Sequence, residues 1–306
     1  MNANKIEHSS KRRTSALAGY AAGVLAGVTY GLNPLFAKPL LDMGVAVDTM
    51  LSIRYLLAVA LLGLWMLLRG ESLRVSAAQL LRLCALGVLF AMSSLTLFLS
   101  YSYIPAGLAT TIVFLYPVLV ALIMVTMKQY PSWQVWLSIF ATFAGVVILS
   151  LPSGGVSLNM HGIALAAASA LSYAFYLVVV NRSRKLSTVP GTVITFYALL
   201  IGCGVFFARA MITGDDFLHG VHGVYCWANL TGLAVFPTLV SLTALALSTR
   251  LIGATKTSVL GVFEPITAIV VGTLVFNEQL TTNVLVGIAI TITAVIFLIV
   301  SEKNRA

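Results

Sequence analysis

The chain has 306 residues, of which 59% are hydrophobic and only 9% are charged, and its formal net charge is +9. Soluble domains carry about 25% charged residues, so this composition excludes an ordinary water-soluble core and indicates a bilayer as the solvent. A positive net charge can indicate a nucleic-acid partner. Here the basic residues sit in short loops between apolar runs, which argues against such a partner.

Apolar windows of about 20 residues are long enough to cross a bilayer. Their number predicts an all-α, polytopic membrane protein with ten transmembrane helices. The expected spans are 16–35, 49–68, 80–100, 106–126, 133–151, 162–180, 192–211, 226–248, 257–276 and 282–300. The expected organisation is a tail (1–15), a first five-helix repeat (16–151), a second five-helix repeat (152–301) and a short C-terminal tail (302–306).

The basic residues divide unequally between the two sets of loops. Of the 18 Lys and Arg residues, 15 fall in the tails and loops on one side, two fall on the other, and Arg54 lies inside a span. Cytoplasmic loops carry the excess of Lys and Arg. Both termini are therefore expected in the cytoplasm. The two basic residues on the outer side are Lys38 and Arg209.

The two halves of the chain resemble one another. Small residues recur at every fourth position in the first span and, 143 positions later, in the sixth: Gly19, Gly23, Gly27 and Gly31, then Gly162, Ala166, Ala170 and Ala174. Each half has five spans, an odd number, so the halves must insert in opposite orientations. Inverted repeats of this kind build secondary transporters with a site near the middle of the membrane.

Two prolines interrupt apolar runs at matching places in the halves. Pro117 follows Tyr116, Pro265 follows Glu264, and the prolines lie 148 positions apart. Proline removes a backbone donor and kinks a helix, and paired interruptions of this kind are a sequence indication of a transport site. We expect bends at both prolines, acting as hinges, to frame a cavity into which Glu264 faces.

Glu264 is the one acidic residue well inside an expected span. A charge at the bilayer centre costs about 2.5–3.5 kcal/mol on insertion scales, so such a residue usually faces protein or water. One interpretation is a proton-coupling group or a counter-ion for a cationic substrate. The other is a protonated glutamate that bonds a neighbouring helix and supports the bend at Pro265.

Arg54 lies five residues after the start of the second expected span. Its long side chain can snorkel to the outer interface. Alternatively, its guanidinium can pair with a substrate carboxylate or with Glu264. A cavity lined by both charges would suit a zwitterion.

Aromatic and small polar side chains accompany these charges in the spans. Pockets for small molecules are mostly apolar, with a few placed polar groups. A single tyrosine in such a span more often packs against a neighbour or anchors the helix at the membrane interface; the set as a whole indicates a pocket. Besides Glu264 and Arg54, the expected substrate-binding residues are Tyr30, Asn33, Ser94, Phe114, Tyr116, Tyr173, Tyr176 and Ser241.

Other function classes lack their signatures. The sequence has no Gly-rich phosphate loop, nucleophile elbow or zinc signature, so neither a cofactor, a metal nor ATP-driven transport is expected. Its three scattered cysteines do not form a disulfide framework. A lipid-modifying membrane enzyme would need clustered acids, a nucleophile–base pair or metal ligands at the bilayer edge. A non-transporting scaffold subunit would leave the internal repeat unexplained.

A set of short motifs in order along the ten spans resembles the drug/metabolite transporter superfamily, specifically its EamA-type members. The motifs are Tyr30-Gly31-Leu32-Asn33 with Lys38, Arg54-Tyr55, Tyr116-Pro117, Gly253-Ala254, Glu264-Pro265, Asn277-Glu278 and Gly287. The resemblance covers essentially the whole chain.

The resemblance implies a secondary carrier of small organic solutes, often an exporter of amino acids or other metabolites in a bacterial inner (plasma) membrane. The residues themselves favour a zwitterionic or cationic substrate. The expected mechanism is alternating access, with Glu264 as the proton-coupling group. A facilitative or cation-selective carrier of quaternary-amine or drug-like solutes stays open as an alternative. A monomer and a homodimer stay open as well.

Overall fold

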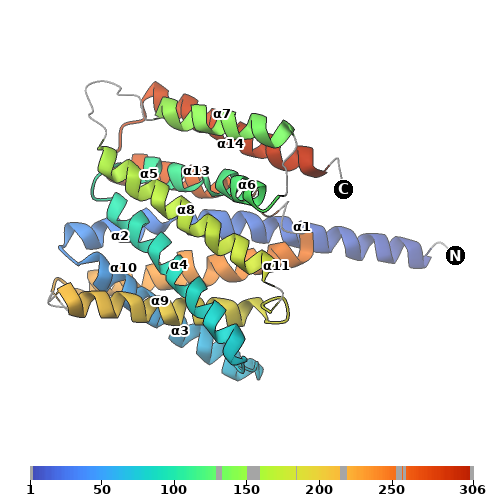
Figure 1. Ribbon diagram of the computed structural model, residues 1–306, viewed down its shortest axis with the longest axis horizontal. Coiled ribbons are helices and arrows are strands. Elements are labelled where there is room, and N and C mark those ends of the chain that lie inside the picture. Colours follow the sequence, from blue (N-terminus) through green and yellow to red (C-terminus); the bar gives the residue numbers. More distant parts are fainter. Residues whose placement is uncertain are drawn as a thin grey trace.

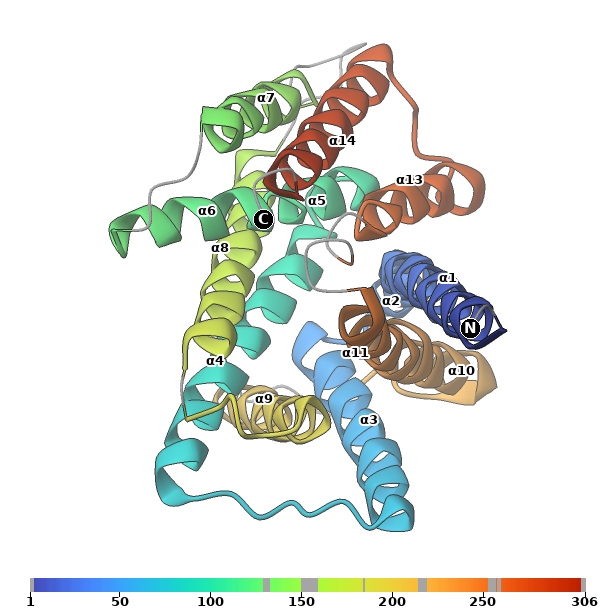
Figure 2. The ribbon, with the colours of Figure 1, turned by 90° about the vertical axis from the view of Figure 1, so that its right-hand side faces the viewer.

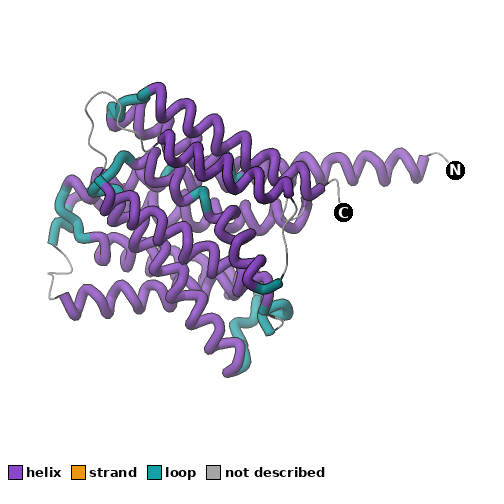
Figure 3. The backbone as a smooth tube through the Cα atoms, turned by 45° about the horizontal axis from the view of Figure 1, so that its top comes forward, coloured by secondary structure: helices purple, strands orange, loops and turns teal. Residues whose placement is uncertain are grey.

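The chain folds into a bundle made entirely of helices. A computed structural model describes residues 3–128, 133–149, 159–183, 185–213, 219–252, 257 and 260–303, and no strand occurs among them (Figure 3). In the first half the helices are α1 (Ala3–Gly31), α2 (Asn33–Asp42), α3 (Val47–Arg69), α4 (Ala77–Ser100), α5 (Ala106–Val113), α6 (Tyr116–Thr126) and α7 (Trp133–Leu149). In the second half they are α8 (Met160–Arg182), α9 (Gly191–Thr213), α10 (Gly223–Ala234), the π-helix η1 (Val235–Val240), α11 (Ser241–Ile252), α13 (Phe263–Phe276) and α14 (Thr282–Lys303).

The helices account for the predicted number of spans. When α1–α2, α5–α6 and α10–η1–α11 are each taken as one broken helix, the described residues form ten helical segments. Six of these helical segments are long and apolar enough to cross a membrane, and α13 and α14 contribute shorter apolar stretches. Both termini lie at the same end of the bundle, as an even number of spans requires (Figure 1). The chain is thus a multi-pass membrane protein.

The N-terminal boundaries differ from those expected. The backbone is already helical from Ala3, and the first span continues beyond residue 35 through α2 to Asp42. Pro34 sits near the start of α2, where its missing N–H removes no helical hydrogen bond, so the chain restarts a helix directly after α1. The boundary between the expected repeats, at 151–152, lies outside the described residues.

Proline also explains the breaks in the fourth and ninth spans. The helix stops at Val113 and restarts at Tyr116, and Pro117 occupies the first turn of α6. Likewise Glu264 and Pro265 lie in the first turn of α13. A proline ring clashes with the preceding turn of a continuous helix, and this clash is absent at a helix start. Each of these helices ends near a left-handed residue, Lys128 with φ 61° and Asn277 with φ 52°.

Corresponding helices of the two halves make equivalent contacts with the opposite half. The first-half helix α4 packs on α8, and its counterpart α11 packs on α1. The pair α5–α6 packs on α8, and α13 packs on α1. Counterparts also contact each other directly: α3 with α9, α5 with α13, and α7 with α14. The last pair lies side by side at one edge of the bundle (Figures 1 and 2).

The glycine ladder of α1 is the surface that receives α11 and α13. A Cβ on Gly19 would meet Leu251 and Ile252, and one on Gly27 would lie 2.8 Å from the Leu260 carbonyl oxygen. A Cβ on Gly31 would lie 2.5 Å from the Glu264 carbonyl oxygen. Small residues allow helix backbones in a membrane to approach this closely. The ladder therefore fixes where α13 presents Glu264.

Gly31→Ala should lower the melting temperature of the purified protein, because the new methyl group meets the α13 backbone, which has no rotamer to change. Overpacking of this kind costs about 1–3 kcal/mol. The measurement is thermal unfolding in detergent.

The matched control is Gly204→Ala in α9, where no heavy atom of another segment lies within 4 Å of a Cβ. It should melt at or above the wild-type temperature, since Ala favours a helix over Gly by about 1 kcal/mol. A Gly31→Ala protein as stable as this control would contradict the close contact.

Candidate functional site

Arg54 is buried in the middle of the bundle. It lies on α3 with 4% of its surface exposed, so its side chain packs against protein. Its Nε donates a hydrogen bond to Thr238 Oγ1 on η1 at 2.8 Å. The centre of the guanidinium lies 5.2 Å from the Phe98 ring and 5.9 Å from the Tyr55 ring. A cation above aromatic faces is stabilised by their electron density, which helps this charge to stay away from water.

Glu264 is the buried acid that faces this region from the second half. It lies in the first turn of α13 with 8% of its surface exposed. No hydrogen bond or ion pair joins its carboxylate to a residue in the described part of the chain. The side chain lies within electrostatic range of four tyrosines, Tyr30, Tyr101, Tyr116 and Tyr173.

Tyr30 and Tyr101 connect the two charges. Each of these tyrosines interacts electrostatically with both Glu264 and Arg54. The carboxylate and the guanidinium form no ion pair with each other among the described contacts. Two opposite charges, one from each half of the chain, therefore lie within electrostatic range of the same pair of tyrosines, and no ion pair joins them among the described contacts.

An aromatic wall adjoins Glu264. The rings of Tyr116 and Tyr173 meet edge to face with centroids 4.9 Å apart, and Tyr173 stacks on Tyr176 at 5.9 Å. Phe114 contacts Tyr116 edge to face at 5.8 Å. The structure thus brings together four of the aromatic residues predicted for the site. It adds Phe90, which lies 5.3 Å from Tyr176.

The predicted small polar residues have other partners. The Ser94 hydroxyl lies 2.5 Å from the Tyr55 hydroxyl. Ser241 Oγ donates to the Ala26 carbonyl oxygen at 3.0 Å and so ties α11 to α1. Asn33 Nδ2 donates to the Tyr30 carbonyl oxygen at 2.9 Å, which leaves the buried Asn33 Oδ1 without a hydrogen-bond partner.

Sequence reasoning missed three residues of this region: Tyr55, Tyr101 and Thr238. Tyr101 stands at the very end of an apolar window, and Tyr55 follows Arg54 directly, so both could pass for residues that anchor the helix at the interface. The neighbouring Pro237 is the one sequence signal for Thr238, because it interrupts the eighth span.

Ion pairs join the helices at one end of the bundle, which the loop charges predict to be the outer end. Lys38 Nζ lies 2.6 Å from Glu278 Oε1 and 4.7 Å from the Phe276 ring centroid. The same Glu278 oxygen accepts a hydrogen bond from the backbone N–H of Ala106 at the start of α5. Glu278 therefore ties the first half of the chain to the second.

A second ion pair lies between α3 and α9. Arg209 binds Asp48 with two hydrogen bonds, from Nε at 3.0 Å and from Nη2 at 3.2 Å. Lys38 and Arg209 are the two basic residues that the sequence places on the outer side. Each of them is neutralised by an acid, which reduces the conflict with the charge rule for membrane loops.

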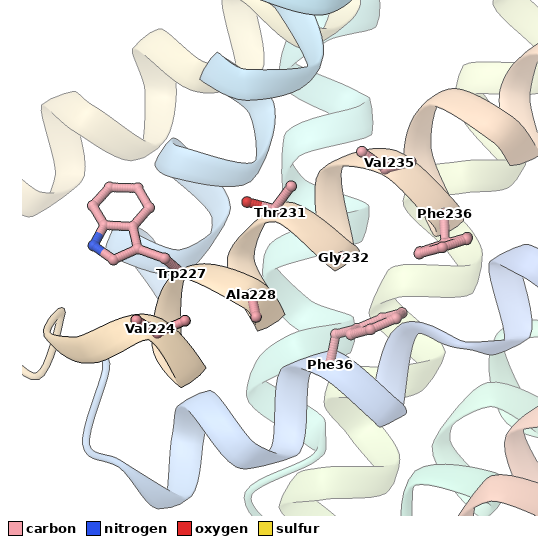
Figure 4. A pocket seen from close by; sticks show the side chains of 8 residues that line it. All are labelled: Phe36, Val224, Trp227, Ala228, Thr231, Gly232, Val235 and Phe236. Atoms are coloured by element: carbon pink, nitrogen blue, oxygen red, sulfur yellow. The ribbon is translucent and has the colours of Figure 1, made fainter.

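A separate apolar groove lies on the outside of α10, between it and α2 (Figure 4). It has a volume of about 440 Å³ and contains neither Glu264 nor Arg54. Phe36 and Phe236 stack across it with centroids 5.7 Å apart. Its lining residues are Phe36, Val224, Trp227, Ala228, Thr231, Gly232, Val235 and Phe236. Acidic, His and Cys residues do not gather in groups of three anywhere in the described ranges.

A model of the EamA-like transporter family matches the chain twice, over residues 17–151 and 160–300. The chain belongs to the EamA-like transporter family. This confirms the predicted resemblance and favours a transporter over a membrane enzyme. The two matches also fall on the two halves in which the sequence repeats.

Relatives of this EamA-like chain include proteins described as uncharacterized transporters. One from Synechocystis sp. is 29% identical over 67% of this chain and 62% of its own length. Another, from Archaeoglobus fulgidus, is 27% identical over 62% of this chain and 66% of its own length. YdfC from Bacillus subtilis is 24% identical over 71% and 70%. The matched region thus spans less than two thirds of the first two relatives.

The fold of this EamA-like protein also occurs in a crystal structure of only 17% sequence identity. The two superpose with a TM-score of 0.67, over 95% of this chain and 98% of the other. At this level of identity the likeness shows the fold alone.

Removing either partner of the Lys38–Glu278 pair from this EamA-like protein should lower its melting temperature more than removing both. Glu278→Gln leaves the half-buried ammonium without its partner, and Lys38→Met does the same to the carboxylate. Breaking a buried pair costs about 3–5 kcal/mol, whereas an apolar replacement of both is often neutral. The measurement is a double-mutant cycle on thermal unfolding in detergent.

Asp42→Asn is the control, because it removes one negative charge from an exposed position at the end of α2. It should change the melting temperature little. If the effects of Glu278→Gln and Lys38→Met simply add, the ion pair contributes no coupling and its stabilising role is wrong.

Proposed function

We propose that this protein is a secondary carrier that exports small zwitterionic metabolites, such as amino acids, across the inner membrane by alternating access. The observation that carries the proposal is the pair of buried opposite charges, Arg54 on α3 and Glu264 on α13, which lie within electrostatic range of the same tyrosines, Tyr30 and Tyr101, and form no ion pair among the described contacts. Arg54 binds the substrate carboxylate and Glu264 binds its ammonium group. One amino acid thereby compensates both charges, which are costly to leave uncompensated in a membrane.

Glu264 also supplies the coupling to protons. When no substrate is bound, a proton on the carboxylate removes the unpaired negative charge from the membrane interior. A bound ammonium group occupies the same place and displaces that proton. Substrate and proton therefore compete for one site, and in a carrier with one such site they move in opposite directions. Inward movement of protons then drives export.

The aromatic wall favours a second candidate, a carrier of quaternary amines or similar cations. Tyr116 and Tyr173 present ring faces and edges beside Glu264. Aromatic cages of this kind bind quaternary ammonium groups. This alternative needs Glu264 but leaves Arg54 without a ligand.

The proposed motion is a rocking of the two halves about this site. The helix breaks at Pro117 and Pro265 serve as hinges, because residues at helix ends absorb changes in backbone angle. The pair α7–α14, which lies at the edge of the bundle, braces the moving helices.

Proteoliposomes loaded with L-leucine should show saturable counterflow of labelled L-leucine, and an outward-directed transport driven by a proton gradient. Glu264→Gln should abolish the proton-driven component, because Gln cannot exchange a proton. Arg54→Met should raise the half-saturation concentration for leucine about 10- to 100-fold, the range for a charge-assisted hydrogen bond.

L-leucinol is the control substrate, because it keeps the ammonium group and lacks the carboxylate. Its counterflow should be unchanged by Arg54→Met. Counterflow of choline in place of leucine would favour the quaternary-amine carrier. Normal proton-driven transport by Glu264→Gln would refute the coupling role.

Cysteines introduced at Tyr116 and Tyr173 should react with a membrane-impermeant methanethiosulfonate from only one side at a time. The background is a variant in which Cys84, Cys203 and Cys226 are replaced by Ala. Saturating leucine or a reversed proton gradient should change which side reacts. Simultaneous labelling from both sides would indicate a channel and would contradict alternating access.

A further inference from the structure

The π-helix η1 sets the position of Thr238. Residues Val235–Val240 form one wide turn between α10 and α11, and π-turns inside α-helices are frequent at functional sites. Pro237 lies within the turn and lacks a backbone N–H. The Thr238 hydroxyl donates a hydrogen bond to the Leu233 carbonyl oxygen, five residues earlier, at 2.9 Å. The hydroxyl is thus held in one orientation.

This orientation determines how Thr238 binds Arg54. A hydroxyl has one hydrogen to donate, and Thr238 gives it to Leu233. Its lone pairs therefore accept the hydrogen bond from Arg54 Nε at 2.8 Å. Both partners are buried, with 2% of Thr238 and 4% of Arg54 exposed. The bond links α3 of the first half to η1 of the second.

The bond to Nε leaves the other end of the guanidinium available. No hydrogen bond joins Nη1 or Nη2 of Arg54 to a residue in the ranges that the structure describes. The rings of Phe98 and Tyr55 lie against the group at 5.2 and 5.9 Å and restrict its rotation. Two parallel N–H groups at the end of a fixed guanidinium match the two oxygens of a carboxylate.

The combination of a π-turn, a hydroxyl and an arginine has no counterpart at the equivalent place in the other half of the repeat. In the register that aligns Ser94 with Ser241, Thr238 falls on Ala91, which has no hydroxyl. Ala91 lies in α4, which is an α-helix without a π-turn. In α9, the counterpart of α3, the one basic residue is Arg209, which binds Asp48. The π-turn, the hydroxyl and the arginine thus come together at a single place.

We propose that Thr238 is the positioning residue for recognition of the substrate carboxylate. Held by the π-turn, it binds Arg54 through Nε and leaves both terminal amino groups to receive the carboxylate end-on. The inference rests on the proposed function and specifies how the site selects the acidic end of its substrate.

The first test is counterflow of L-leucine and L-leucinol in proteoliposomes with Thr238→Val and Thr238→Ser. Val keeps the shape and removes the acceptor, so the half-saturation concentration for leucine should rise about tenfold, the equivalent of one hydrogen bond. The maximal rate and leucinol counterflow should stay within about twofold of wild type. Thr238→Ser should restore leucine binding.

The second test does not depend on transport. In protein labelled with ¹⁵N at arginine Nε, the Arg54 signal is assigned by its loss in Arg54→Lys. Thr238→Val should shift this signal, and Thr238→Ser should leave it near its wild-type position. An unshifted signal in Thr238→Val overturns the positioning role.

The outcomes separate the two hypotheses. If wild-type protein shows no saturable exchange of leucine, the proposed amino acid carrier is wrong, and the NMR result alone decides on Thr238. If leucine is exchanged but Thr238→Val binds it normally, the positioning role is wrong. Equal losses for leucine and leucinol also overturn it, because they indicate a general structural defect.

Discussion

The close approach of α1 to α11 and α13 is the constraint on which the rest of the structure depends. Inside a bilayer, lipid chains are as apolar as leucine, so helices gain little by hiding apolar surface from one another. Association depends instead on close contact, and here the absent side chains of Gly27 and Gly31 let α1 touch the backbone of α13. The same contact presents Glu264, so the packing surface and the candidate site are built from the same turns.

Charges in the bundle fall into two groups with different chemistry. At the predicted outer end, Lys38 with Glu278 and Arg209 with Asp48 are complete ion pairs that join separate helices. In the interior, the partners of Arg54 among the described residues are a threonine hydroxyl and aromatic faces, and Glu264 has tyrosines nearby. Satisfied pairs stabilise helix packing, whereas incompletely satisfied buried charges retain the capacity to bind a ligand.

Much of the fold could be predicted from the sequence, because length, apolarity and proline position act locally. The helix breaks at Pro117 and Pro265 and the small-residue surface of α1 followed from such patterns. The partners of individual side chains did not. Ser94 and Ser241 bind Tyr55 and the α1 backbone, and Thr238 meets Arg54 across 184 residues. Such contacts depend on helix rotation and on a π-turn, which an apolar window of 20 residues does not encode.

The turns that follow the fourth and ninth spans share a backbone shape but differ in charge. Lys128 and Asn277 both adopt the left-handed conformation. The next residue is Glu278 in one turn and Gln129, outside the described residues, in the other. Only one end of the pseudo-symmetric bundle therefore has an acid at this position, and there Glu278 forms an ion pair that joins the turn after α13 to α2. In the alternating-access mechanism proposed above, the inward- and outward-facing states then differ in free energy, and a carrier with this bias has unequal apparent affinities on the two faces of its membrane.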